Sequence, residues 1–141
     1  MIFKLGIVLA SIFALLALLH IFWAAGGSFG NDVTVPMVDG KRAFTPSTTA
    51  TLLVAAALLA AMLVILGQLG VVGERFPKWI FSTGTWVICL LFFIRAIGDF
   101  KLVGFFKQVQ DTGFAYWDTR LFSPLCLLIF GLAFFVAIKK K

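Results

Sequence analysis

The chain has 141 residues, of which 62% are hydrophobic and only 13% are charged, and its formal net charge is +6. Soluble domains contain about 45–50% apolar residues, so this composition excludes an ordinary water-soluble domain and indicates an integral membrane protein. The basic residues are divided among the ends of apolar segments. We therefore expect the positive charge to set topology and attract anionic lipid, with the lipid bilayer as a partner and no nucleic acid.

Four apolar segments are long enough to cross a hydrocarbon core of about 30 Å. They lie at about 2–25, 46–69, 78–98 and 119–138. Together they predict a single transmembrane domain over residues 1–141 with an all-α fold, an integral membrane four-helix bundle. The first segment also resembles a signal peptide, because Lys4 precedes its apolar run and a small-residue stretch ends it. Its apolar run is longer than a usual secretory core, so we interpret it as a retained anchor.

Proline and hydroxyl residues indicate where the later helices begin. Thr45 and Pro46 predict the start of the second helix, as a cap and a first-turn residue, and Pro77 predicts the third in the same way. Ser123 and Pro124 resemble another helix start. A helix from there to position 138 would be short for a bilayer, so we expect 117–122 to contribute a preceding turn or an interfacial segment.

The basic residues are nearly balanced between the two sides of the predicted bundle. One side carries the 70–78 link, the N-terminus and the lysines at 139–141, and the other carries the two longer loops. The C-terminal lysines and the basic residues of the link lie directly beside span ends, where the positive-inside rule has most force. This favours both termini in the cytoplasm, in a multi-pass protein of the bacterial inner (cytoplasmic) membrane.

The second long loop and the cysteines allow simple interpretations. Residues 100–119 mix aromatic and charged side chains, which is typical of a segment in the headgroup region, or of a lid over the mouth of the bundle. Cys89 and Cys126 lie inside predicted spans and are interpreted as small hydrophobic residues. His20 is the single histidine, so we predict no metal site, and the sequence identifies no cofactor.

Several polar side chains fall at a similar depth on the side opposite the termini. His20 and Trp23 are three residues apart and share a helix face, as do Arg95 and Asp99, which are four apart. Helices one, three and four are therefore predicted to surround a polar cup. The candidate ligand-binding residues are His20, Trp23, Arg95, Asp99, Trp117 and Asp118.

Arg95 is the most informative of these residues, because an arginine inside a span costs about 2.5–3.5 kcal/mol at mid-helix. It needs a partner, and Asp99 is the local candidate while Asp118 is the candidate across helices. Arg95 then either fixes helix packing as an ion pair or presents its fork to an anionic ligand. His20 either makes a structural hydrogen bond or, beside a carboxylate, serves as a proton site.

Three motifs together resemble a known family. They are H-x-x-W-A-x-G-G from position 20, R-A-I-G-D from position 95 and F-A-Y-W-D-T-R-L-F-S-P-L-C from position 114. The chain resembles an uncharacterised bacterial family of small four-span membrane proteins, a domain of unknown function. The resemblance implies a four-helix layout over nearly the whole chain and brings no established substrate or reaction.

The leading hypothesis is a small multi-pass membrane protein with an outward-facing polar pocket that binds or transports a small polar or anionic molecule or a proton. Costly polar residues at one depth on several spans motivate it. One alternative is a membrane-embedded enzyme acting on a lipid or quinone, with His20 as acid or base and Arg95 as an oxyanion or phosphate clamp. No nucleophile arrangement, phosphate loop or metal-ligand spacing accompanies these two residues. Another is a non-catalytic subunit of a membrane complex. A homo-oligomer is compatible with each hypothesis.

Overall fold

The protein is an all-α four-helix bundle, as the composition predicts. Its structure is a computed structural model that describes residues 1–139. Two of the three C-terminal lysines used to predict the topology, at 140 and 141, lie outside the described residues. The long helices are α1 (Ile2–Ala24), α2 (Thr48–Gln68) and α3 (Lys78–Ile97). The fourth is continuous over Gly113–Ile138 and consists of α4 (Gly113–Trp117), η2 (Asp118–Phe122) and α5 (Ser123–Ile138).

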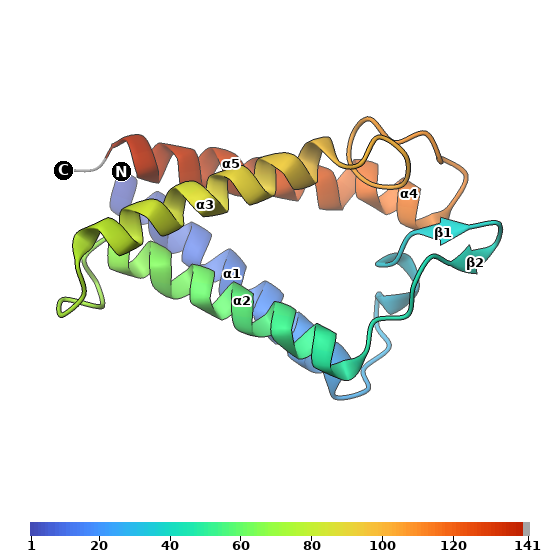
Figure 1. Cartoon of the computed structure of the whole chain (residues 1–141), viewed down its shortest axis with the longest axis horizontal. Helices are drawn as coiled ribbons and strands as arrows, with labels where there is room; N and C mark the ends of the chain where they lie inside the picture. The colour runs from blue at the N-terminus through green and yellow to red at the C-terminus, as the bar shows by residue number, and fades with distance from the viewer. Residues whose placement is uncertain (140–141) are drawn as a thin grey trace.

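The helices are arranged as two antiparallel pairs. α1 packs mainly against α2, and α3 packs mainly against α5, with fewer contacts between the pairs. Both chain ends lie at one end of the bundle, which we call the terminal end, and the two long loops lie at the other, the loop end (Figure 1). The pairs are close at the terminal end and diverge toward the loop end. Phe13, Ile65 and Ile129 form the centre of the buried core.

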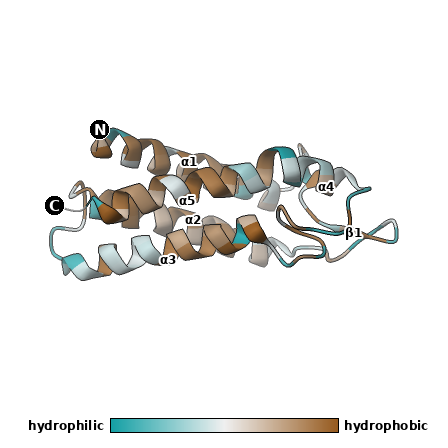
Figure 2. Ribbon diagram, turned by 90° about the horizontal axis from the view of Figure 1, so that it is seen from above, coloured by the Kyte–Doolittle hydropathy of each residue, from teal (hydrophilic) through white to brown (hydrophobic). Residues whose placement is uncertain are grey.

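The outer surface of the bundle is apolar. Each of the four long helices is long and apolar enough to cross a membrane, and Figure 2 shows the hydrophobic colour running along them with hydrophilic residues concentrated toward the ends and loops. Leu15, Leu53 and Leu90 each expose more than half of their surface. Such a surface is unfavourable in water, and it matches the lipid environment expected from the sequence.

A short hairpin occupies part of the first long loop. After a 3₁₀ turn, η1 (Asn31–Val33), the strands β1 (Met37–Val38) and β2 (Lys41–Arg42) pair antiparallel. Asp39 and Gly40 form the connection, both with positive φ, at 50° and 75°. Asp-Gly is a strong two-residue hairpin signal because both turn positions need positive φ. The sequence predicts only a loop here, since two-residue strands are too short for an alternating pattern.

The start of α2 differs from the prediction. Thr45 and Pro46 precede the helix, and its N-cap is Ser47, whose Oγ accepts a hydrogen bond from the amide of Ala50 at 3.1 Å. Position 47 has extended backbone with ψ near 161°, as an N-cap requires. The hydroxyl two residues after Thr45 therefore satisfies one of the first free amides.

Ser47→Ala is expected to lower the free energy of unfolding by about 1 kcal/mol, because the amide of Ala50 loses its acceptor. Thr45→Ala is the matched control, since Thr45 lies outside the helix and should change stability little. Thermal unfolding of the purified proteins in one detergent checks both. Equal losses for the two variants would contradict the assignment of the cap.

The fourth helix begins before the predicted start at 119 and is widened near its N-terminal end. Its cap is Thr112, whose Oγ1 accepts from the amide of Ala115 at 3.0 Å. Pro124 lies inside the continuous helix, where a proline ring crowds the carbonyl four residues earlier and supplies no amide. The turn just before it, η2, is π-helical. We attribute the wider turn to Pro124, so the Ser-Pro pair marks a change of helical geometry instead of a helix start.

Candidate functional site

Asp118 lies at the centre of a polar cluster at the loop end. Its carboxylate is fully buried. One oxygen accepts a hydrogen bond from the guanidinium of Arg95 at 2.8 Å, and the other accepts from the amide of Gly104 at 2.8 Å. The same second oxygen lies 3.2 Å from Nζ of Lys107. Asp118 therefore joins α3, the 98–112 loop and the fourth helix in one network.

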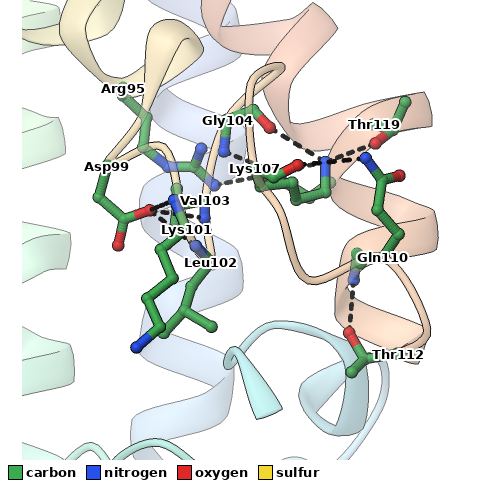
Figure 3. Close-up of polar contacts among 12 residues, drawn as sticks. Arg95, Asp99, Lys101, Leu102, Val103, Gly104, Lys107, Gln110, Thr112 and Thr119 are labelled. Carbon is green, nitrogen blue, oxygen red and sulfur yellow. Dashed lines mark hydrogen bonds and ion pairs between the residues drawn. The ribbon is translucent and has the colours of Figure 1, made fainter. Parts of the chain in front are cut away.

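Lys107 is the residue that the sequence interpretation missed. Its side chain is fully buried, although it belongs to a loop without regular structure. Besides Asp118, its ammonium group donates to the carbonyl of Gly104 at 3.0 Å and to the hydroxyl of Thr119. Figure 3 shows this ammonium between the loop and the fourth helix, with dashed lines to the carbonyl of Gly104 and the hydroxyl of Thr119. The loop is thus held onto the fourth helix by a buried ionic anchor.

Asp99 makes a different set of contacts and does not pair with Arg95. One of its carboxylate oxygens accepts from the amides of Lys101, Leu102 and Val103, at 3.0, 2.8 and 3.0 Å (Figure 3). These hydrogen bonds stabilise the charged carboxylate, with the largest effect from the amide of Lys101. They hold the pKa of the exposed Asp99 carboxyl below its ordinary value. Of the two partners considered for Arg95, Asp118 is the one that binds it.

Arg95 has unused hydrogen-bonding capacity. A guanidinium has five N–H donors. The nitrogen Nη2 donates to Asp118, while Nη1 is buried and has no hydrogen-bond partner among the described residues. The side chain as a whole is 33% exposed. In addition, two cations, Arg95 and Lys107, share the single carboxylate of Asp118, so these three side chains together carry one unit of excess positive charge.

His20 lies on α1, in the helix pair opposite the one that carries Arg95. Its Nδ1 lies 2.7 Å from the carbonyl oxygen of Leu16. Since a carbonyl only accepts, Nδ1 is the donor in this contact. Within residues 1–139 no carboxylate lies within ion-pair distance of His20, so the arrangement is not the carboxylate-supported proton site considered above. The ring packs edge-on against Trp23, with centroids 5.1 Å apart.

Two adjoining cavities occupy the loop end between the helix pairs. The first has a volume of about 610 Å³ and lies among α1, the start of α2 and the hairpin loop, with Arg42 and Thr45 in its wall. The second, about 390 Å³, lies between the pairs and has Arg95 in an otherwise mainly apolar wall. His20 and Trp23 line both cavities. We call the first the vestibule and the second the central cavity.

The comparisons with known proteins identify a family. A family model described as "Protein of unknown function (DUF3995)" matches residues 13–134, which is most of the chain and includes all six candidate residues. The chain belongs to this family. The resemblance of the sequence motifs to a family of small four-span proteins of unknown function is thereby confirmed. No curated protein and no solved structure matches the chain, so the site of this DUF3995 member is interpreted from its own geometry.

The structure divides the six candidate residues of this DUF3995 member into three groups. His20, Trp23 and Arg95 line the central cavity, and Asp118 lies behind Arg95 and fixes its guanidinium. Asp99 and Trp117 line neither cavity; Asp99 orders the loop and Trp117 packs edge-on against Tyr116. No group of three or more potential metal ligands occurs within residues 1–139.

Proposed function

We propose that this protein is a small multi-pass membrane protein that binds a small molecule with an anionic group in the central cavity, using Arg95. The single observation that carries the proposal is the unpartnered Nη1 of a cavity-lining arginine whose cluster has one excess positive charge. A buried donor without a partner costs about 1–3 kcal/mol. A turn of this partly exposed guanidinium toward the cavity would let an anionic ligand supply both the missing acceptor and the missing charge.

The size and surroundings of the cavities suit a small ligand. Ligand-binding pockets commonly have volumes of about 300–1,000 Å³ with a mainly apolar wall and a few polar groups, and both cavities fall in this range. The vestibule connects the loop surface with Trp23 and His20, which also border the central cavity. A ligand that enters between the loops therefore meets the imidazole of His20 and the guanidinium of Arg95 from opposite helix pairs.

The arrangement of basic residues supports an orientation with the loop end facing outward from a bacterial inner membrane. At the terminal end, Lys78 is the first residue of α3 and Lys139 follows the last residue of α5. Basic residues directly beside span ends are those for which the positive-inside rule has most force. At the loop end, by contrast, Lys107 is buried against Asp118. This placement favours the terminal end in the cytoplasm.

Arg95→Gln is expected to weaken anion binding about tenfold to a hundredfold, because a charge-assisted hydrogen bond contributes about 1.5–3 kcal/mol. Arg120→Gln is the matched control, since Arg120 stacks on Tyr116 at 3.9 Å and lines neither cavity. The measurement is the rise in melting temperature of the purified protein with increasing methyl phosphate. Binding that is unchanged in Arg95→Gln, or no binding by the unmodified protein, would contradict the proposal.

A further inference from the structure

A third cavity lies beside the central one, along the side of the bundle. It is a groove of about 480 Å³ between α2 and α3, and apart from Arg95 its wall is apolar. Ala57, Ala60 and Gly84 leave room along it because their side chains are small. Val87 and Leu91, on the α3 wall, are 49% and 59% exposed. The groove therefore opens on the outer, apolar surface of the bundle.

Arg95 lies where the groove meets the central cavity. It lines both, together with Val54, Leu58 and Phe92. From Val54 the groove follows α2 toward the terminal end as far as Val64, which is about 15 Å at 1.5 Å per residue. One end of an apolar groove thus carries a cation with unused donors, and the rest of it lies against the region expected to be lipid.

This combination of charge and shape fits an amphiphile. We propose that the anionic ligand is a membrane lipid with one hydrocarbon chain, whose phosphate or carboxylate headgroup binds Arg95 while its chain lies in the groove between α2 and α3. The inference rests on the proposed anion binding and names the class of ligand. The planar guanidinium matches the oxygens of such headgroups, and the excess positive charge of the Arg95, Lys107 and Asp118 cluster complements their negative charge.

The groove would favour the hydrocarbon chain by close packing and not by the hydrophobic effect. A hydrocarbon chain in a bilayer is already in an apolar solvent, so moving it into the groove is favoured only by close packing. Filling the groove should therefore remove the contribution of the chain while leaving the headgroup site intact. This separates the two parts of the ligand experimentally.

The chain offers matched variants on both walls. The double variant Ala57→Leu with Ala60→Leu fills the groove from α2, and Ala56→Leu adds the same side chain on an exposed position of α2 outside the groove. From α3, Val87→Phe fills the groove and Leu90→Phe, at an exposed position outside it, is the control. The second pair answers the question if the double alanine variant does not fold.

The test compares hexadecyl phosphate with methyl phosphate on the full chain in phosphatidylcholine nanodiscs, with empty nanodiscs giving the background partition of the probe. We expect hexadecyl phosphate to bind about tenfold more weakly to either groove-filled protein and to Arg95→Gln, and normally to Ala56→Leu and Leu90→Phe. Methyl phosphate should bind the groove-filled proteins as it binds the unmodified one.

The outcomes distinguish the two proposals. Normal binding of hexadecyl phosphate to the groove-filled proteins, with methyl phosphate still dependent on Arg95, would overturn the lipid proposal and leave anion binding in place. Binding of both probes to Arg95→Gln at the unmodified level would overturn both. Loss of hexadecyl phosphate binding in the groove-filled proteins but not in Arg95→Gln would place the headgroup elsewhere and also overturn the inference.

Discussion

Asp118→Asn is expected to lower the free energy of unfolding by about 3–5 kcal/mol, the usual cost of removing one partner from a buried ion pair. The substitution leaves the guanidinium of Arg95 and the buried ammonium of Lys107 without their shared counter-charge. The substitution should also weaken the attachment of the 98–112 loop, because the amide of Gly104 donates to the same carboxylate. Thermal unfolding measures the first effect, and trypsin cleavage after Lys107 measures the second.

Two further variants make this result specific. Asp111→Asn removes a carboxylate from an exposed position in the same loop and should leave both readouts unchanged. Combining Asp118→Asn with Lys107→Met removes one of the two uncompensated cations, so part of the lost stability should return. A melting temperature for Asp118→Asn equal to that of the unmodified protein would show that the cluster does not hold the loop.

Gly104→Ala is expected to displace the 98–112 loop from the end of α3. A Cβ at this position would lie 2.2 Å from the carbonyl oxygen of Ile97, and the backbone φ is +88°. Positive φ alone costs a non-glycine residue about 1–2 kcal/mol. The clash with backbone adds to that cost, because a carbonyl cannot turn away as a flexible side chain can. We expect a lower melting temperature and trypsin cleavage after Lys107.

Gly30→Ala is the control for the positive-φ cost. Gly30 has φ of +73°, and a Cβ there would meet no atom within 4 Å. The difference between the two variants thus measures the clash at Gly104. The neighbouring Gly98 makes the same contact from the other side, with its Cβ position 1.8 Å from the carbonyl oxygen of Val103. Equal losses in Gly104→Ala and Gly30→Ala would mean that the loop does not need this close approach.

Composition and segment length were sufficient to predict the fold class. Uninterrupted apolar segments leave helices as the only way to satisfy the backbone in lipid, and the all-α four-helix bundle is confirmed. Helix starts were harder to place. Pro124 resembles a first-turn residue, but it lies inside a helix that begins at Gly113. A proline pattern does not distinguish a helix start from a π-helical turn, because the local sequence requirement is the same.

The site was only partly predictable for a similar reason. Arg95 was singled out because a charge in a span is costly, but the choice between Asp99 and Asp118 depended on the loop. Asp99 accepts hydrogen bonds from three nearby amides, and this arrangement requires the turn at Gly98. Lys107 gave no signal, since a lysine among loop residues is normally exposed. Lys107 is buried because the loop folds back onto Asp118 in the fourth helix. The periodicity of a sequence does not indicate such a contact between distant segments.

The divergence of the two helix pairs has a mechanical consequence. The two helix pairs pack together around Phe13 and Ile129 and diverge toward the loops (Figure 1). The bundle therefore has one tightly packed end and one open end. A small rotation about the tightly packed end displaces the opposite tips by a larger distance. Arg95 and His20 belong to opposite helix pairs and lie toward the loop end, so such a rotation changes their separation more than it changes the packing around Phe13.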